Sequence, residues 1–224
     1  NTPFIEAYGT KPLGAQFYPE DMTKEEFDAW DDESKSSLYT MIRRDQDGNL
    51  MSIPYHEFFS KEIKKAAKLI KKAATLADDP GLKNYLELRA EALLTDEYLD
   101  SDMAWMDMKT NSIDFVVGPI ENYEDALYGY KAAHESYVLI KDKEWSQKLD
   151  RFAVLLPELQ RSLPVPDEYK QEIPGSDSDL GVYDAIFYGG DCNAGSKTIA
   201  INLPNDERVH IEKGSRKLQL KNSM

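Results

Sequence analysis

The sequence predicts an α+β fold, with N-terminal helices followed by a mostly antiparallel β-sheet or small β-barrel. Apolar residues recur at helical spacing between residues 55 and 95, whereas short runs rich in β-branched and aromatic residues begin near residue 113. Because helices and strands are grouped rather than alternating along the chain, the pattern indicates α+β rather than a parallel βαβ architecture. We expect a helical region at 1–110 and a β-rich core at 111–224, joined in one lobe.

The overall charge and hydrophobicity restrict the kinds of molecule that the protein is expected to bind. The 224 residues include 27 Lys and Arg against 41 Asp and Glu, which gives a net charge of -14. This acidity argues against nucleic acid as a partner, because binding to phosphates needs clustered basic residues. No apolar run reaches the ~18 residues that span a membrane, so no membrane contact is expected. The lone Cys192 rules out an internal disulfide and favours a reducing, cytoplasmic location.

The N-terminal segment shows one helix start and one turn. Residues 1–22 contain Pro and Gly at intervals that predict an extended lead-in. A helix is expected from Thr23, with acidic residues in its first turn, through Leu38. The segment 45–48 is a turn signal that resembles part of a calcium-binding EF-hand loop. His56 stands at the twelfth position, where such a loop needs Glu, so calcium binding is not expected.

The clearest helix is expected at 55–78. Its apolar residues fall at alternating steps of four and three, namely Phe59, Ile63, Ala66, Ile70, Ala73 and Ala77. Lysines cover much of the remaining surface; a solvated face is the simplest interpretation, and an acidic or membrane partner is the alternative. Asp-Asp-Pro-Gly then ends this helix, and a second helix from about Gly81 to Thr95 completes an antiparallel hairpin.

The second half of the chain is dominated by strand patterns. Residues 113–117 and 137–140 are β-rich runs, and a helix follows from about Asp142. The apolar stripe of that helix is Trp145, Leu149, Phe152, Leu156 and Leu159. Pro157 should kink or divide the helix, because proline removes a helical hydrogen bond. Residues 164–181 are expected to form a loop, and the remaining strand candidates are 182–188, 196–203, 207–212 and 216–221.

Histidines are the first residues to test for metal chemistry. The chain has three, His56, His134 and His210. His56-Glu57 and His134-Glu135 each begin like a zinc-peptidase motif, but no second His follows at the required spacing. Because a catalytic zinc needs about three protein ligands plus water, no metal site is expected within the chain.

A set of polar residues stands beside the predicted strands. Its members are Glu121, Tyr123, Glu135, Asn202 and Asn205. Carboxylates can bind an ammonium group through charge-assisted hydrogen bonds, and an Asn side chain can both accept from and donate to a peptide backbone. An exposed strand edge can also pair with an extended peptide. From the residues alone, these side chains are either solvated turn residues or a peptide-binding site.

Three segments carry a family resemblance that favours the second interpretation. They are Pro119-Ile-Glu-Asn-Tyr-Glu-Asp125, Ala133-His-Glu-Ser-Tyr137 and Ile199-Ala-Ile-Asn-Leu-Pro-Asn205. In order and spacing they resemble the substrate-binding half of the dipeptidyl peptidase III family of zinc exopeptidases. Asn122 stands where the family has Ser, and the family's His-Glu-x-x-Gly-His zinc motif is absent. Residues 1–110 look like a shorter bacterial or plant variant, which is sometimes fused behind a Nudix hydrolase domain.

The resemblance implies that Glu121, Tyr123, Asn202 and Asn205 grip the free N-terminus of a peptide substrate, and that Glu135 lies in the same cleft. It implies that zinc and the general base belong to a C-terminal catalytic lobe that begins after this chain ends. The isolated chain is therefore expected to hold no catalytic residue, metal or cofactor and to be inactive. The alternatives are a non-catalytic peptide- or partner-binding domain attached to a Nudix hydrolase, and a purely structural domain.

Overall fold

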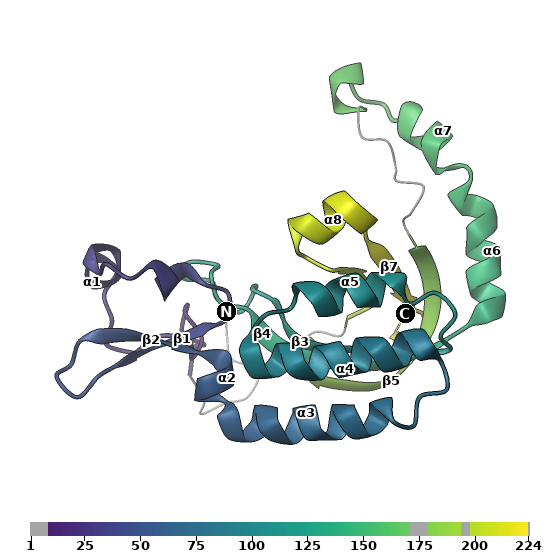
Figure 1. The fold of residues 1–224 in the computed structure, drawn as a ribbon. Helices are drawn as coiled ribbons and strands as arrows, with labels where there is room; N and C mark the ends of the chain where they lie inside the picture. The colour runs from purple at the N-terminus through teal and green to yellow at the C-terminus, as the bar shows by residue number, and fades with distance from the viewer. Residues whose placement is uncertain (1–8, 171–178, 194–197, 224) are drawn as a thin grey trace.

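A computed structural model describes residues 9–170, 179–193 and 198–223. Its centre is a five-stranded sheet that curls around α4 (Pro80–Thr95) and α5 (Leu99–Asp107), and α3 (Ser60–Ala74) packs along α4 (Figure 1). A small two-stranded sheet and α1 (Lys24–Ala29) lie at one end of this body (Figure 1). The α+β class is confirmed, and the Lys-rich helix lies outside the sheet as expected.

The first helix begins where the sequence predicts and ends earlier. The Thr23 side chain accepts a hydrogen bond from the Glu26 backbone N–H at 3.1 Å and so caps α1. The helix ends at Ala29 rather than Leu38, because Asp32 caps a separate 3₁₀ turn.

A β-hairpin follows that the sequence signals only through its turn. Its antiparallel strands are β1 (Thr40–Arg44) and β2 (Leu50–Pro54). The Asp45 carboxylate accepts hydrogen bonds from the backbone N–H groups of Asp47 at 2.9 Å and Asn49 at 2.8 Å. The carboxylate of this EF-hand-like segment therefore holds a tight turn.

The predicted helix at 55–78 is two helices, α2 (Tyr55–Phe58) and α3. The buried residues of α3 are Ile63, Ala67, Ile70 and Ala74. The stripe therefore keeps Ile63 and Ile70 but passes through Ala67 and Ala74 instead of Ala66 and Ala73. The α5 helix was not predicted, because it is only nine residues long and its acidic residues interrupt the apolar ones.

The main sheet has the strand order β3-β4-β5-β7-β6. Its strands are β3 (Ile113–Glu121), β4 (Ala133–Lys141), β5 (Asp179–Gly190), β6 (Ala200–Leu203) and β7 (Arg216–Leu220). All neighbouring strands are antiparallel except β5 and β7, which are parallel. The prediction that the strands after residue 110 form one mostly antiparallel sheet is confirmed.

A helix, α8 (Glu207–Lys213), occupies the place of one predicted strand, so the strand prediction at 207–212 was wrong. Val209 and Ile211 alternate with polar residues, as strand residues do. The Asp206 side chain, however, accepts a hydrogen bond from the Arg208 backbone N–H at 2.9 Å and caps a helix start. Gly214 ends the helix with a φ of 73°, a backbone conformation that favours glycine.

The helix predicted from Asp142 is divided, as Pro157 led us to expect. Its parts are α6 (Lys143–Ala153) and α7 (Leu156–Arg161), with Pro157 in the first turn of α7. Residues 171–178 of the predicted loop and 196–197 of a predicted strand lie outside the described residues.

One hydrophobic core joins the helices to the concave face of the sheet. It contains Ile70, Leu86 and Trp105 from helices, and Tyr137 and Leu218 from strands. A second, smaller cluster under the hairpin consists of Tyr18, Phe27, Ile42 and Leu50. Side chains from both sides of residue 110 share the larger core, and a domain boundary at that residue stays a prediction.

A buried ion pair ties β3 to β7. Arg216 Nη2 donates to Asp114 Oδ2 at 2.9 Å, and the two side chains are 1% and 0% exposed. The Arg216 guanidinium also lies 4.3 Å from the Trp105 ring centroid and donates to the Tyr183 hydroxyl at 3.1 Å. Because β4 and β5 lie between β3 and β7 in the sheet, the pair spans the concave side and holds the curl.

We predict that Asp114→Ala lowers the free energy of unfolding by about 3–5 kcal/mol, because it leaves the Arg216 charge buried without its partner. The control is Asp107→Ala, which removes an exposed ion pair with Lys213 and should cost about 0–1 kcal/mol. Urea denaturation of both variants measures the difference. Equal losses would contradict the role given to the buried pair.

Candidate functional site

The C-terminal ends of β3 and β6 meet at one corner of the curled sheet. Asn205, just beyond β6, donates from Nδ2 to the Ile120 backbone oxygen at 3.2 Å and to Glu121 Oε2 at 3.5 Å. Although 84 residues separate Glu121 from Asn205 along the chain, folding makes them direct neighbours. Two of the predicted site residues are therefore in contact.

Glu121 also contacts Tyr123. The two side chains share a hydrogen bond, and Tyr123 is otherwise exposed. Partial burial raises the pKa of the Glu121 carboxyl, while the hydrogen bonds from Asn205 and Tyr123 act in the opposite direction. The carboxylate is thus half-buried and held from two sides, an arrangement that suits an ammonium ligand.

Glu135 is a buried carboxyl on β4, beside this group. It accepts a hydrogen bond from the Tyr137 hydroxyl at 3.1 Å. Burial, together with the negative charges of Glu121 and Asp191, raises its pKa from an ordinary value near 4.5 to about 7. Glu135 therefore adds an anionic group whose ionisation is costly until a cation arrives.

Asp191 is a neighbour that the sequence did not single out. It follows the last residue of β5, Gly190, which pairs with Glu135 across the sheet. A Cβ at position 190 would collide with the His134 carbonyl oxygen, and the φ of Gly190 is 78°. The glycine therefore lets β5 turn tightly against β4 and brings Asp191 near Glu135.

Asn202 stands apart from the other four residues. It lies on β6 between the buried residues Ile201 and Leu203, so its exposed side chain points away from the core. Within the described part of the chain, no hydrogen bond joins Asn202 to the other predicted site residues. β6 ends the strand order of the sheet, so Asn202 is on an edge strand.

The Asp125 side chain anchors the loop that carries Tyr123. The buried Asp125 carboxylate accepts hydrogen bonds from the Tyr18 hydroxyl at 2.7 Å and from several backbone N–H groups of the loop, including that of Tyr130 at 2.9 Å. Lys131 nearby donates from Nζ to the Ser37 backbone oxygen at 2.9 Å. The N-terminal hairpin region thus supports the loop between β3 and β4.

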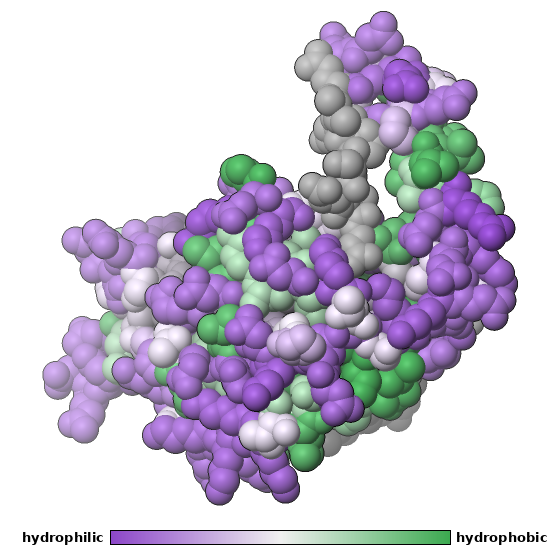
Figure 2. All heavy atoms as spheres, turned by 45° about the vertical axis from the view of Figure 1, so that its right-hand side comes forward, coloured by the Kyte–Doolittle hydropathy of each residue, from purple (hydrophilic) through white to green (hydrophobic). Residues whose placement is uncertain are grey.

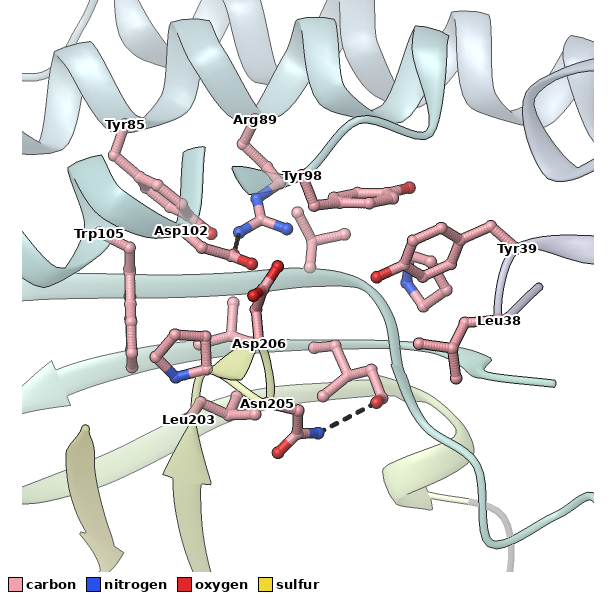
Figure 3. A pocket seen from close by; sticks show the side chains of 15 residues that line it. Leu38, Tyr39, Tyr85, Arg89, Tyr98, Asp102, Trp105, Leu203, Asn205 and Asp206 are labelled. Atoms are coloured by element: carbon pink, nitrogen blue, oxygen red, sulfur yellow. Dashed lines mark hydrogen bonds and ion pairs between the residues drawn. The ribbon is translucent and has the colours of Figure 1, made fainter. Parts of the chain in front are cut away.

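A pocket of about 170 Å³ lies between the helices and the ends of β3 and β6, with Asn205 at its edge (Figure 3). Arg89 of α4 is ion-paired with Asp102 of α5 and lies 5.4 and 5.3 Å from the ring centroids of Tyr85 and Tyr98. In Figure 3 the Asp206 carboxylate points toward this pair. Sequence reasoning missed these charges, although an Arg inside the apolar pattern of α4 was a visible signal.

The described residues do not provide a zinc site. In the ranges 9–170, 179–193 and 198–223, no three His, Cys, Asp or Glu side chains gather so that they could hold a metal ion. His56 contacts Asp96, His134 packs against Tyr55, and His210 contacts a backbone oxygen, so the histidines lie in separate places. No metal-dependent step can be derived from this set of residues.

We predict that Glu135→Gln stabilises the folded chain at pH 8 by roughly 2–3 kcal/mol, because the variant carries no buried charge. Because the pKa of Glu135 is raised in the folded state, the folded wild-type protein loses the Glu135 proton at a higher pH than the unfolded protein does. The stability of the wild-type protein should therefore fall as the pH rises from about 4.5 to about 7. Near pH 4.5 the wild-type protein and Glu135→Gln should be equally stable. Urea unfolding across this range tests the prediction; a constant difference would refute it.

Comparisons with known proteins agree on one family. The model of peptidase family M49 matches residues 16–224. The structure of dipeptidyl peptidase III from Caldithrix abyssi superimposes with a TM-score of 0.90 at 49% identity, over 98% of this chain and 43% of that chain. The dipeptidyl peptidase III of Corallococcus sp. strain EGB gives 0.83 at 37% identity, over 98% and 42%.

A curated relative is named Nudix hydrolase 3, from Arabidopsis thaliana. It is 36% identical over 240 residues, which cover 95% of this chain and 31% of the relative. The chain thus spans less than half the length of each of these proteins. The resemblance to dipeptidyl peptidase III is confirmed, and the chain belongs to peptidase family M49.

Proposed function

We propose that this chain is the substrate-binding, zinc-free lobe of a dipeptidyl peptidase III-like metallopeptidase, and that it holds the N-terminal end of peptides. The observation that carries the proposal is the contact of Glu121 with both Tyr123 and Asn205, beside the buried Glu135. These groups come from three different strands or strand ends, and a merely solvated turn would not gather them.

The proposed chemistry is recognition of an ammonium group and the first peptide units. Glu121 supplies negative charge, and Glu135 adds more once its proton leaves. Asn205 donates from Nδ2 to Ile120, which leaves its side-chain oxygen oriented by the protein and able to accept from a ligand. An extended peptide could pair with the edge strand β6, where Asn202 is exposed.

The catalytic groups would come from elsewhere in a longer protein. Family M49 is a metallopeptidase family, and zinc with its ligands is proposed to lie in a C-terminal catalytic lobe that the present residues lack. When bound there, zinc would supply the activated water for hydrolysis. The residues of this chain would bind and orient the peptide.

Other features of the proposal concern partners and location. The plant relative's name is consistent with a Nudix domain on the same protein, so a partner-binding role beside such a domain is the alternative. Within the described residues, none of the helices has both the length and the apolar character that crossing a membrane requires. We propose a cytoplasmic location and no nucleic-acid partner, on the grounds of the single cysteine and the net charge of -14.

We predict that Asn202→Ala weakens binding of a tetrapeptide with a free N-terminus by about 1–3 kcal/mol, because a polar group of the peptide loses its partner. Titration calorimetry with the 224-residue chain measures this loss. Asn84→Ala, which removes an exposed Asn from α4, is the matched control and should have no effect.

The same titration with an N-acetylated peptide separates recognition from folding. This ligand has no ammonium group to bind at Glu121, so it should bind weakly and without a fixed position along β6, and its binding should change little in Asn202→Ala. Equal losses for both peptides would mean that Asn202 acts only through the fold, and the proposed role would fail.

A further inference from the structure

Glu135 and Tyr137 form a polar pair inside the curled sheet. Both side chains point to the concave side of β4, because residues two apart on a strand share a face. The face of the molecule in Figure 2 is largely hydrophilic at its surface, whereas these two side chains lie beneath the surface and are 5% and 2% exposed. A buried carboxyl needs hydrogen-bond partners, so the groups around Glu135 decide how readily it can ionise.

The Tyr137 hydroxyl links Glu135 to the segment that precedes β6. Its oxygen lies 3.1 Å from Glu135 Oε2 and 3.1 Å from Thr198 Oγ1, although Thr198 is 61 residues away along the chain. The Leu220 backbone N–H donates to the Ile199 oxygen at 3.0 Å, which fixes this segment against β7. A single phenol thus joins β4 to the start of β6, two strands that are not neighbours in the sheet.

A phenol carries one proton, so Tyr137 cannot donate to both of its neighbours at once. When Glu135 is ionised, Tyr137 donates to the carboxylate and accepts from the Thr198 hydroxyl. When Glu135 holds a proton, the carboxyl can donate to Tyr137, which then donates to Thr198. Tyr137 has one donor and one acceptor in each state, and the change between the states needs only rotation of hydroxyl groups.

We propose that Tyr137 and Thr198 are positioning residues for the candidate site: their hydroxyls form a relay that holds the Glu135 carboxyl in place in both its protonated and its ionised state. An ammonium ligand needs the ionised state, and the relay supplies the donor that this state requires. Thr198 stands two residues before β6, the edge strand proposed to pair with the peptide. The use of the relay in binding rests on the proposed function, whereas its effect on Glu135 in the free chain does not.

Other titratable groups also face Glu135, namely Glu121, Tyr123, Asp191 and Cys192. The two carboxylates among them raise the pKa of Glu135, and the Cys192 backbone N–H lowers it. The Cys192 thiol contacts the Tyr137 hydroxyl, and burial raises the pKa of this thiol. Because the Tyr137 hydroxyl lowers the pKa of Glu135 by donating to it, removing that hydroxyl has an effect of definite sign.

The pH dependence of stability in the peptide-free chain tests the relay. In each background, the difference in free energy of unfolding between the protein and its Glu135→Gln counterpart isolates the titration of Glu135. In the wild-type background this difference should change until about pH 7. In Tyr137→Phe it should go on changing to a pH about one unit higher, because the carboxylate has lost a donor.

The matched control is Tyr188→Phe. Its ring packs against that of Tyr137 at 5.7 Å between centroids, and its hydroxyl contacts Ser223. The same loss of a hydroxyl next to Tyr137 should leave the titration range of Glu135 unchanged. An unchanged range in Tyr137→Phe, or an equal shift in Tyr188→Phe, would overturn the proposal.

Thr198→Val tests the second hydroxyl of the relay. It should shift the titration range of Glu135 by less than Tyr137→Phe does. It should also add nothing in the double variant, because Thr198 acts on Glu135 only through Tyr137. Additive shifts in the double variant would mean that the two residues act separately, and the relay would be refuted.

A second measurement covers a Tyr137→Phe chain that does not fold. Tyrosine labelled with ¹³C at the ring carbon that bears the hydroxyl is incorporated into Tyr123→Phe, which removes the exposed tyrosine beside Glu121. One resonance should move with pH near 7, as Glu135 titrates, and should stay still when Glu135→Gln is added. If no tyrosine resonance follows Glu135, the proposal fails.

Calorimetric titration with a tetrapeptide that has a free N-terminus tests the use of the relay in binding. Affinity should rise as Glu135 ionises, and in Tyr137→Phe binding at pH 7 should be weaker by roughly fivefold, because a smaller fraction of the chain is ionised. A shifted Glu135 titration with an unchanged binding profile would overturn the positioning role. Absence of binding in the wild-type chain would refute the proposed function instead, since the titration in the free chain is measured without peptide.

Discussion

The buried ion pair between Asp114 and Arg216 sets the shape on which the site depends. It crosses the concave side of the sheet, from β3 to the non-adjacent β7, and it is covered by Trp105 from α5. A flat sheet would place β3 and β6 at opposite edges. The curl instead brings the end of β3 to the end of β6, where Asn205 bonds to Ile120 and Glu121.

The resulting corner gathers carboxyl groups whose negative charges repel one another. Burial raises the pKa of both Glu121 and Glu135; the negative charge of Asp191 acts in the same direction on both, and that of Glu121 does so on Glu135, so the corner favours holding a proton. An ammonium group would relieve this repulsion. Such an arrangement costs stability, which is typical of functional sites rather than of solvated turns.

Local features of the fold could be predicted from the sequence, and long-range ones could not. The caps at Thr23 and Asp142 and the division at Pro157 are encoded within a few residues. The strand prediction at 207–212 was wrong because it relied on the alternation of apolar residues, whereas Asp206 caps a helix that begins at Glu207. The partnership of Asp114 with Arg216 depends on contacts between segments 102 residues apart, which no local pattern reports.

Part of the candidate site could likewise be predicted from the sequence, and part of it could not. The resemblance to dipeptidyl peptidase III led to Glu121, Tyr123 and Asn205, which the fold brings into contact. Asp191 and Arg89 belong to no motif, and only the tight turn at Gly190 and the packing of α4 against α5 reveal their positions. The most direct test is a crystal structure of the chain with a bound tetrapeptide that has a free N-terminus. We expect the ammonium nitrogen within about 2.7–3.2 Å of Glu121 and Asn205; an N-terminus bound away from this corner would contradict the proposed role of these residues.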